Sequence, residues 1–118
     1  MKYFTIQELS DSDTAKKMNI HNEPDKEVEK NMHQLVNVVL DPARELLGMP
    51  IRVNSGYRSK KLNEVVGGAT RSYHLSGRAA DITAGSISAN RRLYAILRKL
   101  PHKELIWEKG GIWIHIAL

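Results

Sequence analysis

A histidine and an aspartate lie seven positions apart in the segment from Ser72 to Asp81, which reads Ser-Tyr-His-Leu-Ser-Gly-Arg-Ala-Ala-Asp. Imidazole and carboxylate groups are common zinc ligands, and the glycine between them allows the chain to turn. Another histidine, His115, lies in a strongly β-forming run near the C-terminus. We therefore predict that His74, Asp81 and His115 bind one zinc ion and leave its fourth tetrahedral position for water.

The sequence places Asp81 between Ala80 and Ile82, where an unpaired carboxylate would be costly to bury. A metal ion would account for this position. The alternative is that Asp81 forms a salt bridge with Arg58 or Arg78 inside the fold, because buried charges are either paired or bound to metal.

Size and composition indicate one soluble globular domain over residues 1–118, since 42% of the residues are hydrophobic and 26% are charged. The chain has no cysteine, which excludes disulfides, thiolate catalysis and Cys-type zinc sites. Any metal must be held by nitrogen and oxygen. The net charge of +5 favours a polyanionic neighbour, but the basic residues are scattered in short clusters, so we expect no nucleic-acid site. A basic nucleic-acid binder, the alternative, would show steeply salt-dependent affinity for DNA.

Apolar spacing predicts an amphipathic helix that starts at Pro24, is kinked or broken by Pro42 near Leu40-Asp41, and ends at Gly48. Its buried stripe is predicted to include Leu46. Further patterns predict helices over 60–66 and 88–100, the latter capped by Ser88, strands over 51–55 and 78–83, and a C-terminal hairpin of 103–108 and 112–117. The predicted fold class is therefore α+β, with a small antiparallel sheet and helices packed on it.

The hairpin determines where Glu108 lies relative to His115. A two-residue loop places both side chains on one face of the sheet, whereas a three-residue loop sends Glu108 to the other face. With Gly110-Gly111 as the turn, Ile106 faces His115 and Glu108 is its diagonal neighbour, at about 7 to 8 Å between backbones. From there it could take a proton from water on the metal. The alternative is a solvent-exposed turn residue.

Alternation along the last strand places Trp113 on the face of His115 and points Ile112, Ile114 and Ile116 to the core. Arg58 follows a predicted strand end. A guanidinium there can reach a substrate carboxylate or the oxyanion that forms during hydrolysis.

Several motifs together resemble the M15 zinc peptidases. They are Ser-Gly-Tyr-Arg-Ser at 55–59, Asn63, Gly67-Gly68-Ala69, Ser-x-His-x-x-Gly-x-Ala-x-Asp and a C-terminal Trp-x-His. The resemblance spans residues 42 to 116 and is strongest to the small phage and bacterial M15A-like branch. It implies a hedgehog/DD-peptidase fold and cleavage of bacterial peptidoglycan stem peptides, by a D-Ala-D-Ala carboxypeptidase or by an endopeptidase of endolysin type.

The resemblance also implies roles for individual residues. His74, Asp81 and His115 would be the zinc ligands, and Arg58 and Ser72 would contact substrate. Trp113 joins these two as a candidate substrate-binding residue, while Glu108 and Arg58 are the candidate catalytic residues. Some members carry the general base three residues before the last histidine, where this chain has Ile112. The branch it most resembles has a glutamate six residues before, and Glu108 is seven before, consistent with one extra glycine in the turn.

The alternative function is a catalytically inactive, zinc-stabilised module that binds the cell wall or a protein, as the hedgehog signalling domains illustrate for this fold. No segment is long enough to span a membrane, and the first eight residues lack the apolar region of a signal peptide. We therefore expect a monomer that is made in the cytoplasm and reaches the wall by phage-type lysis or another export route.

Overall fold

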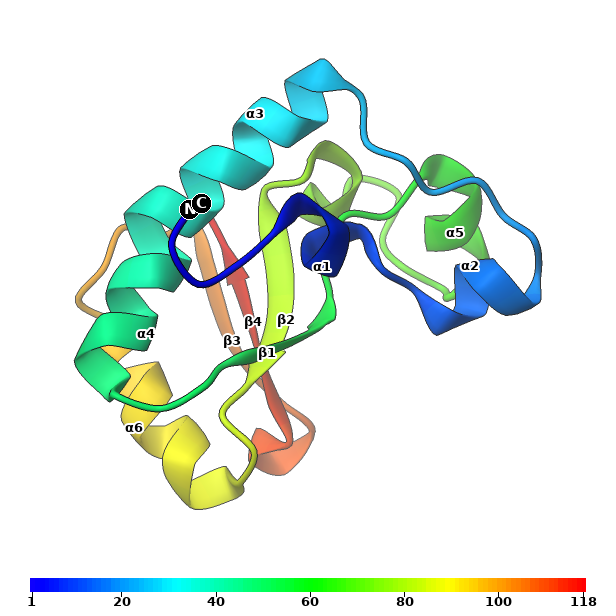
Figure 1. Cartoon of the computed structure of the whole chain (residues 1–118). Coiled ribbons are helices and arrows are strands. Elements are labelled where there is room, and N and C mark those ends of the chain that lie inside the picture. Colours follow the sequence, from blue (N-terminus) through cyan, green and yellow to red (C-terminus); the bar gives the residue numbers. More distant parts are fainter.

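Four antiparallel strands form the central sheet of the computed structural model, which describes residues 1–118 (Figure 1). The strands are β1 (Arg52–Ser55), β2 (Ala79–Thr83), β3 (Glu104–Glu108) and β4 (Trp113–Ala117), in the spatial order β1-β2-β4-β3. The predicted α+β class, with a small antiparallel sheet and helices packed on it, is confirmed.

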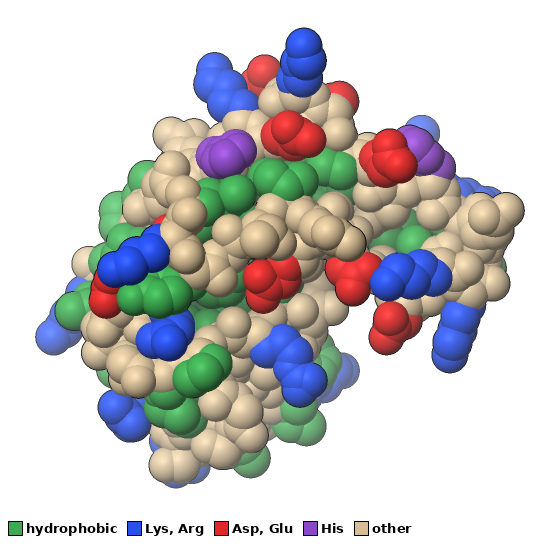
Figure 2. Space-filling view, in the orientation of Figure 1, with side chains coloured by type: hydrophobic (Ala, Val, Ile, Leu, Met, Phe, Trp, Pro, Cys, Tyr) green, Lys and Arg blue, Asp and Glu red, His purple; other side chains and the backbone are tan.

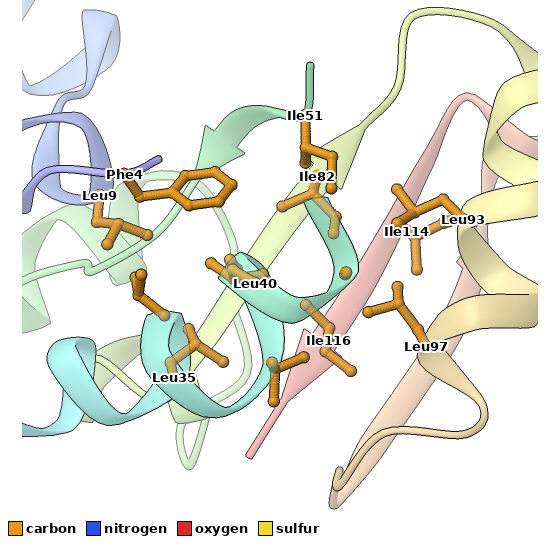
Figure 3. Close-up of a cluster of buried hydrophobic side chains, with 14 of the residues drawn as sticks. Phe4, Leu9, Leu35, Leu40, Ile51, Ile82, Leu93, Leu97, Ile114 and Ile116 are labelled. Atoms are coloured by element: carbon orange, nitrogen blue, oxygen red, sulfur yellow. The ribbon is translucent and has the colours of Figure 1, made fainter. Parts of the chain in front are cut away.

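One face of this sheet packs on helices. Figure 1 shows the run formed by α3 (Lys26–Leu35), a π-helical turn (Val36–Leu40) and α4 (Asp41–Leu47) beside the sheet, with α6 (Ile87–Leu97) next to it. Side chains from both layers form one buried hydrophobic cluster, much of it drawn in Figure 3. It includes Leu35, Val36, Leu40, Ile82, Leu93, Leu97, Ile114 and Ile116.

The long helical run differs from the prediction at its start, in its middle and in one residue of its buried stripe. The run begins at Lys26 and not at Pro24, and Asp25 caps it by accepting a hydrogen bond from the backbone of Val28. Pro42 lies in the first turn of α4, where its missing N–H is tolerated, and the π-helical turn before it keeps the run continuous instead of broken. Gly48 ends the run in the left-handed conformation, as predicted. Leu46 is 67% exposed and does not belong to the core.

Shorter helices extend from the other end of the sheet, with α1 (Ile6–Ser10), α2 (Asp13–Lys17) and α5 (Lys60–Val65) on one side in Figure 1. A 3₁₀ turn, η2 (Tyr73–Ser76), carries His74 and leads into β2. The cap of α6 is Ser86 and not Ser88, because the Ser86 hydroxyl accepts a hydrogen bond from the backbone of Ala89.

The C-terminal hairpin has the register expected for a turn centred on Gly110-Gly111, with Ile106 opposite His115 and Glu108 opposite Trp113, although residues 109–112 connect the strands instead of two or three residues. Its strands are joined by a 3₁₀ turn, η3 (Lys109–Gly111), and by Ile112. The prediction that Ile112 points to the core is wrong, because this residue lies in the connection and is 60% exposed. Ile114 and Ile116 are fully buried, as predicted.

Because successive side chains of a strand point to opposite faces, burial of Ile82 and Ile114 on the helical face sends Asp81 and His115 to the other face. That face is available for a site. On the side drawn in Figure 2, Lys and Arg side chains are dispersed among Asp and Glu and form no continuous basic surface. None of the helices is both long and apolar enough to cross a bilayer.

Candidate active site

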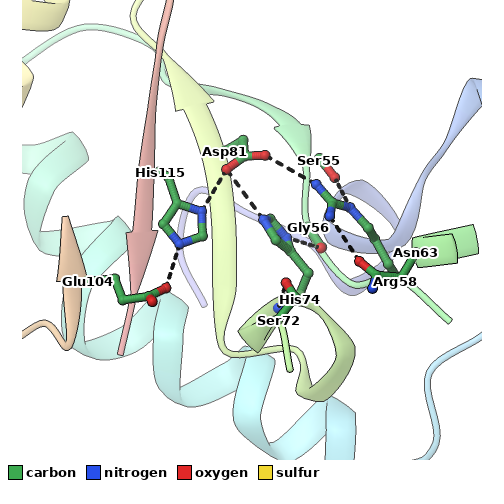
Figure 4. A network of polar contacts seen from close by, with 9 residues as sticks. All are labelled: Ser55, Gly56, Arg58, Asn63, Ser72, His74, Asp81, Glu104 and His115. Carbon is green, nitrogen blue, oxygen red and sulfur yellow. Dashed lines mark hydrogen bonds and ion pairs between the residues drawn. The ribbon is translucent and has the colours of Figure 1, made fainter. Parts of the chain in front are cut away.

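Three potential metal ligands meet on the open face of the sheet (Figure 4). One nitrogen each of His74 and His115 and one carboxylate oxygen of Asp81 all lie within 4.8 Å of one another. Oδ1 of Asp81 is 3.4 Å from Nε2 of His74 and 2.9 Å from Nδ1 of His115. The sequence therefore identified three side chains that the fold brings together.

Local hydrogen bonds fix the orientation of His74. Its Nδ1 lies 2.7 Å from the carbonyl oxygen of Gly56 and donates to it, which leaves Nε2 directed at Asp81. The Ser72 hydroxyl caps the η2 turn by accepting a hydrogen bond from the His74 backbone, and the backbone N–H of Arg58 donates to the His74 carbonyl. The His74 side chain is 3% exposed, so it has little freedom to turn away.

The N-terminal helix α1 helps to fix the backbone that holds His74, through a contact that the sequence did not indicate. The backbone N–H of Tyr57 donates to the carbonyl of Leu9 over 2.7 Å. At Gly56 this backbone segment runs so close to α1 that a Cβ atom would lie 2.1 Å from that same Leu9 oxygen. Only glycine fits here, and its carbonyl is the one that holds His74.

Strand pairing fixes His115. It lies directly opposite Asp81 in the β2–β4 ladder, so the two side chains are neighbours on one face. Its Nδ1 faces Asp81, while its Nε2 lies 2.8 Å from Oε1 of Glu104 on β3. Glu104 was missed by the sequence analysis, which considered only Glu108, although the register that places Glu108 diagonally from His115 places Glu104 diagonally on the other side.

Arg58 contacts the second oxygen of Asp81, with Nη2 at 3.4 Å from Oδ2. Its Nε donates to the Ser55 hydroxyl and its Nη1 to Oδ1 of Asn63, each over 3.1 Å. A Cβ at Gly68 would lie 2.0 Å from the Asn63 oxygen, so a residue without a side chain is required there. The alternative pairing of Asp81 with Arg58 is therefore present together with the histidine contacts, whereas Arg78 donates to the carbonyl of Leu118.

These contacts shift the ionisation of the site. Burial raises the pKa of Asp81, but hydrogen bonds from His115 and His74 outweigh burial and hold that pKa well below its ordinary value. Burial lowers the pKa of His115, but hydrogen bonds with Asp81 and Glu104 outweigh it and raise that pKa. Burial lowers the pKa of Arg58, and the nearby Asp81 charge opposes this shift. The site thus holds an ionised carboxylate beside its two imidazoles.

The site opens into a cleft of about 350 Å³. All seven residues singled out from the sequence line it, so the structure brings together the candidate ligands, the candidate base and the candidate substrate contacts. Arg71, which the sequence analysis did not consider, also lines the cleft, where it is exposed and makes no ion pair. The other lining residues are Ala69, Glu104 and Ile106.

The donor set fits zinc. For bonds of about 2.0 to 2.2 Å in a tetrahedron, ligand atoms are about 3.3 to 3.6 Å apart. The separation of 3.4 Å between His74 and Asp81 meets this requirement, and the 2.9 Å between His115 and Asp81 needs only a small outward movement. The ligand nitrogens of the two histidines lie within 4.8 Å of each other, so binding would draw them together. Two imidazoles and a carboxylate are also ligands that zinc uses in catalytic sites with one open position.

Two known proteins are similar to this chain. The chain is 50% identical over 48 residues to the zinc D-Ala-D-Ala carboxypeptidase of Streptomyces albus G, a match covering 40% of this chain and only 19% of that protein. Its fold is similar to the crystal structure of the L-Ala D-Glu endopeptidase ChiX of Serratia marcescens, with a TM-score of 0.52 and 21% identity over 79% of this chain and 86% of the other.

A match at the level of a whole family goes further, because it covers nearly every residue of the chain. The sequence model for Peptidase M15 matches residues 2–117 and so includes both the central His74 to Asp81 motif and the C-terminal His115. The resemblance inferred from those motifs is confirmed, and the chain belongs to the Peptidase M15 family.

Proposed function

We propose that the protein is a zinc-dependent peptidase that hydrolyses peptide bonds in the stem peptides of bacterial peptidoglycan. The observation that carries this proposal is the convergence of His74, Asp81 and His115 at the base of an open cleft in a chain of the M15 family. The name of the Streptomyces relative supports both zinc and a D-alanyl peptide as substrate. Action on the wall would require release by lysis or export.

When bound, zinc would supply Lewis-acid polarisation of the scissile carbonyl and lower the pKa of a water to about 7. The residues of the chain would then have to accept the proton that this water loses. Glu108 is the candidate for that general base, because it lines the cleft and lies one diagonal step from His115 across the hairpin. The other nearby carboxylate, Glu104, is already engaged by Nε2 of His115.

Two arginines make the cleft suited to an anionic peptide. Arg58 is 15% exposed and is held by Ser55, Asn63 and Asp81, so it can present its remaining N–H groups to a developing oxyanion without reorienting. Arg71 is exposed on the same cleft and free to pair with a carboxylate. Stem peptides carry free carboxylates, which supports them as substrates over neutral peptides.

The test is digestion of purified muropeptides with the zinc-loaded protein, followed by mass spectrometry of the products. Loss of a single terminal residue would identify a carboxypeptidase, and two internal fragments an endopeptidase. Glu108→Gln and a chelator-treated sample serve as controls and should both be inactive. If the wild type binds zinc but leaves every muropeptide intact, the peptidase proposal fails and a zinc-stabilised binding module replaces it.

A further inference from the structure

Glu104 is the one carboxylate outside the candidate ligand set that touches a candidate ligand. Its Oε1 lies 2.8 Å from Nε2 of His115, the ring nitrogen that faces away from His74 and Asp81. We propose that Glu104 is a positioning residue that holds His115 with Nδ1 directed at the metal. This inference rests on the proposed zinc site, but it concerns metal binding and does not depend on which peptide is cleaved.

The protons of the imidazole determine which of its nitrogens can bind a metal. A neutral histidine carries one N–H, and a metal can bind only the nitrogen that lacks it. Without metal, Nδ1 of His115 faces Asp81 and Nε2 faces Glu104, so the ring can donate to a carboxylate at each nitrogen. A metal that takes the place of the Nδ1 proton leaves the Nε2 proton, which the Glu104 carboxylate accepts. Nδ1 is the nitrogen that lies 2.9 Å from Asp81. Glu104 therefore favours the His115 tautomer whose Nδ1 can bind a metal next to Asp81.

His74 is held in the complementary way. Its Nδ1 donates to the Gly56 carbonyl, and its Nε2 faces Asp81. The two histidines thus use different nitrogens toward the same point, and each has its remaining nitrogen fixed by an acceptor. For His74 this acceptor belongs to the backbone, whereas for His115 it is a side chain that mutation can remove.

The register of the hairpin explains why Glu104 can reach this position. Glu104 lies opposite Ala117, one diagonal step from His115, and the small Ala117 side chain leaves the path to the ring open. The Glu104 side chain remains 41% exposed, so its removal leaves no buried cavity. An effect on metal binding after its removal would accordingly not be a secondary result of unfolding.

Contact with the metal-distal nitrogen also separates Glu104 from the general base. A base must reach water on the open side of the ion, whereas Glu104 approaches the outer edge of the His115 ring. Glu108 lies on the opposite side of Ile106, along the same strand. One strand would then supply a carboxylate that orients a ligand and another that accepts a proton.

The experiment measures the zinc affinity of the full chain by competition with a chromophoric chelator, in the absence of any peptide. We expect Glu104→Ala to lower the affinity by about 10- to 100-fold. Glu104→Gln, which keeps an acceptor but loses the charge, should recover part of that loss. Glu27→Ala, an exposed glutamate on α3, removes the same charge away from the cleft and should match the wild type. Circular dichroism of each metal-free variant checks that it is folded.

Muropeptide cleavage at saturating zinc provides the second measurement. Glu104→Ala should recover most of its turnover once enough zinc is added, whereas Glu108→Gln should bind zinc normally and remain inactive. Unchanged zinc affinity in a folded Glu104→Ala protein would overturn the positioning role while leaving the peptidase proposal intact. Loss of turnover in Glu104→Ala that zinc cannot restore would also overturn it, by making Glu104 the base. A wild type that binds no zinc would overturn both proposals.

Discussion

The carbonyl oxygen of Gly56 accepts a hydrogen bond from Nδ1 of His74 over 2.7 Å, so a backbone group determines which face of this imidazole is offered to a metal. That carbonyl is fixed in turn, because the adjoining Tyr57 N–H is bonded to Leu9 of α1. The N-terminal helix therefore belongs to the construction of the site, although it contributes no side chain to it.

Gly56→Ala should disturb both stability and metal binding. Its Cβ would meet the Leu9 carbonyl at 2.1 Å, and relief of that overlap must move either α1 or the Gly56 carbonyl. We expect a loss of about 1 to 3 kcal/mol in the free energy of unfolding of the metal-free protein, measured in urea, together with weaker zinc binding. Gly85→Ala, where no atom lies within 4 Å of the new Cβ, should leave zinc affinity unchanged. Equal zinc affinity in both variants would contradict this role of Gly56.

Glu108→Gln should abolish turnover without loss of zinc. A general base typically contributes about 100- to 10,000-fold to the rate, so kcat should fall by that factor. The amide has nearly the same shape and Glu108 makes no hydrogen bond to His115, so zinc affinity should stay within about threefold of the wild type. Steady-state cleavage of a defined muropeptide measures the first quantity. A variant that retains wild-type kcat would remove Glu108 from the mechanism.

Asn90 on α6 should prove essential for the hairpin that carries His115. It is fully buried, accepts a hydrogen bond from the backbone of Ala84 and donates to the carbonyls of Gly111 and Ile112. Asn90→Leu would leave these backbone groups unsatisfied, at about 1 to 3 kcal/mol for each. We predict a loss of this size in the free energy of unfolding, measured as a lower midpoint in urea. Asn31→Leu, which removes one bond on the helical side, should cost less. If the two variants were equally stable, the hydrogen bonds of Asn90 would have no special importance for the hairpin.

The pH dependence of stability should change sign with the metal. In the metal-free protein the raised pKa of His115 stabilises the fold fully below about pH 6.5, the unfolded value, and this contribution is lost as pH rises through the folded pKa. The zinc-loaded protein should instead gain stability over the same range, because zinc displaces the His115 proton. Urea unfolding between pH 5.5 and 8, with and without chelator, distinguishes the two slopes. His115→Asn should abolish the pH dependence of the unfolding free energy in the metal-free protein. If this pH dependence persists in the variant, it comes from another group.

Removal of zinc should lower the melting temperature. At a zinc concentration of about 1,000 times Kd, ligand binding stabilises the folded state by about 4 kcal/mol. For a chain of this length that corresponds to a shift of roughly 10 °C or more. Calorimetry before and after exhaustive chelation measures it, with His74→Ala as a variant that should show no shift. Identical melting temperatures with and without chelator would count against a bound metal in the wild type.

Sequence reasoning predicted the parts of this site that depend on side-chain chemistry and strand periodicity. His74, Asp81 and His115 were identified from residue type and spacing, and the alternation of β4 correctly placed Trp113 beside His115. The hairpin register followed from Gly110-Gly111. Each of these features can be recognised within its own short segment, His74 and Asp81 in one and His115 in another.

What the sequence did not reveal depends on contacts between distant segments. The Leu9 to Tyr57 bond and the close approach at Gly56 join residues almost fifty positions apart, and no pattern in either segment indicates them. Glu104 could have been found, because the register that placed Glu108 beside His115 applies equally to it. Exposure of Ile112 depended on the length of the 3₁₀ connection, which apolar alternation alone could not set.

Diffraction data collected on either side of the zinc absorption edge, from crystals of the zinc-loaded protein, would show whether two imidazoles and one carboxylate bind a single zinc ion. We expect one anomalous peak within about 2.0 to 2.2 Å of His74 Nε2, His115 Nδ1 and an oxygen of Asp81. A peak elsewhere on the chain, or none in the cleft, would contradict it.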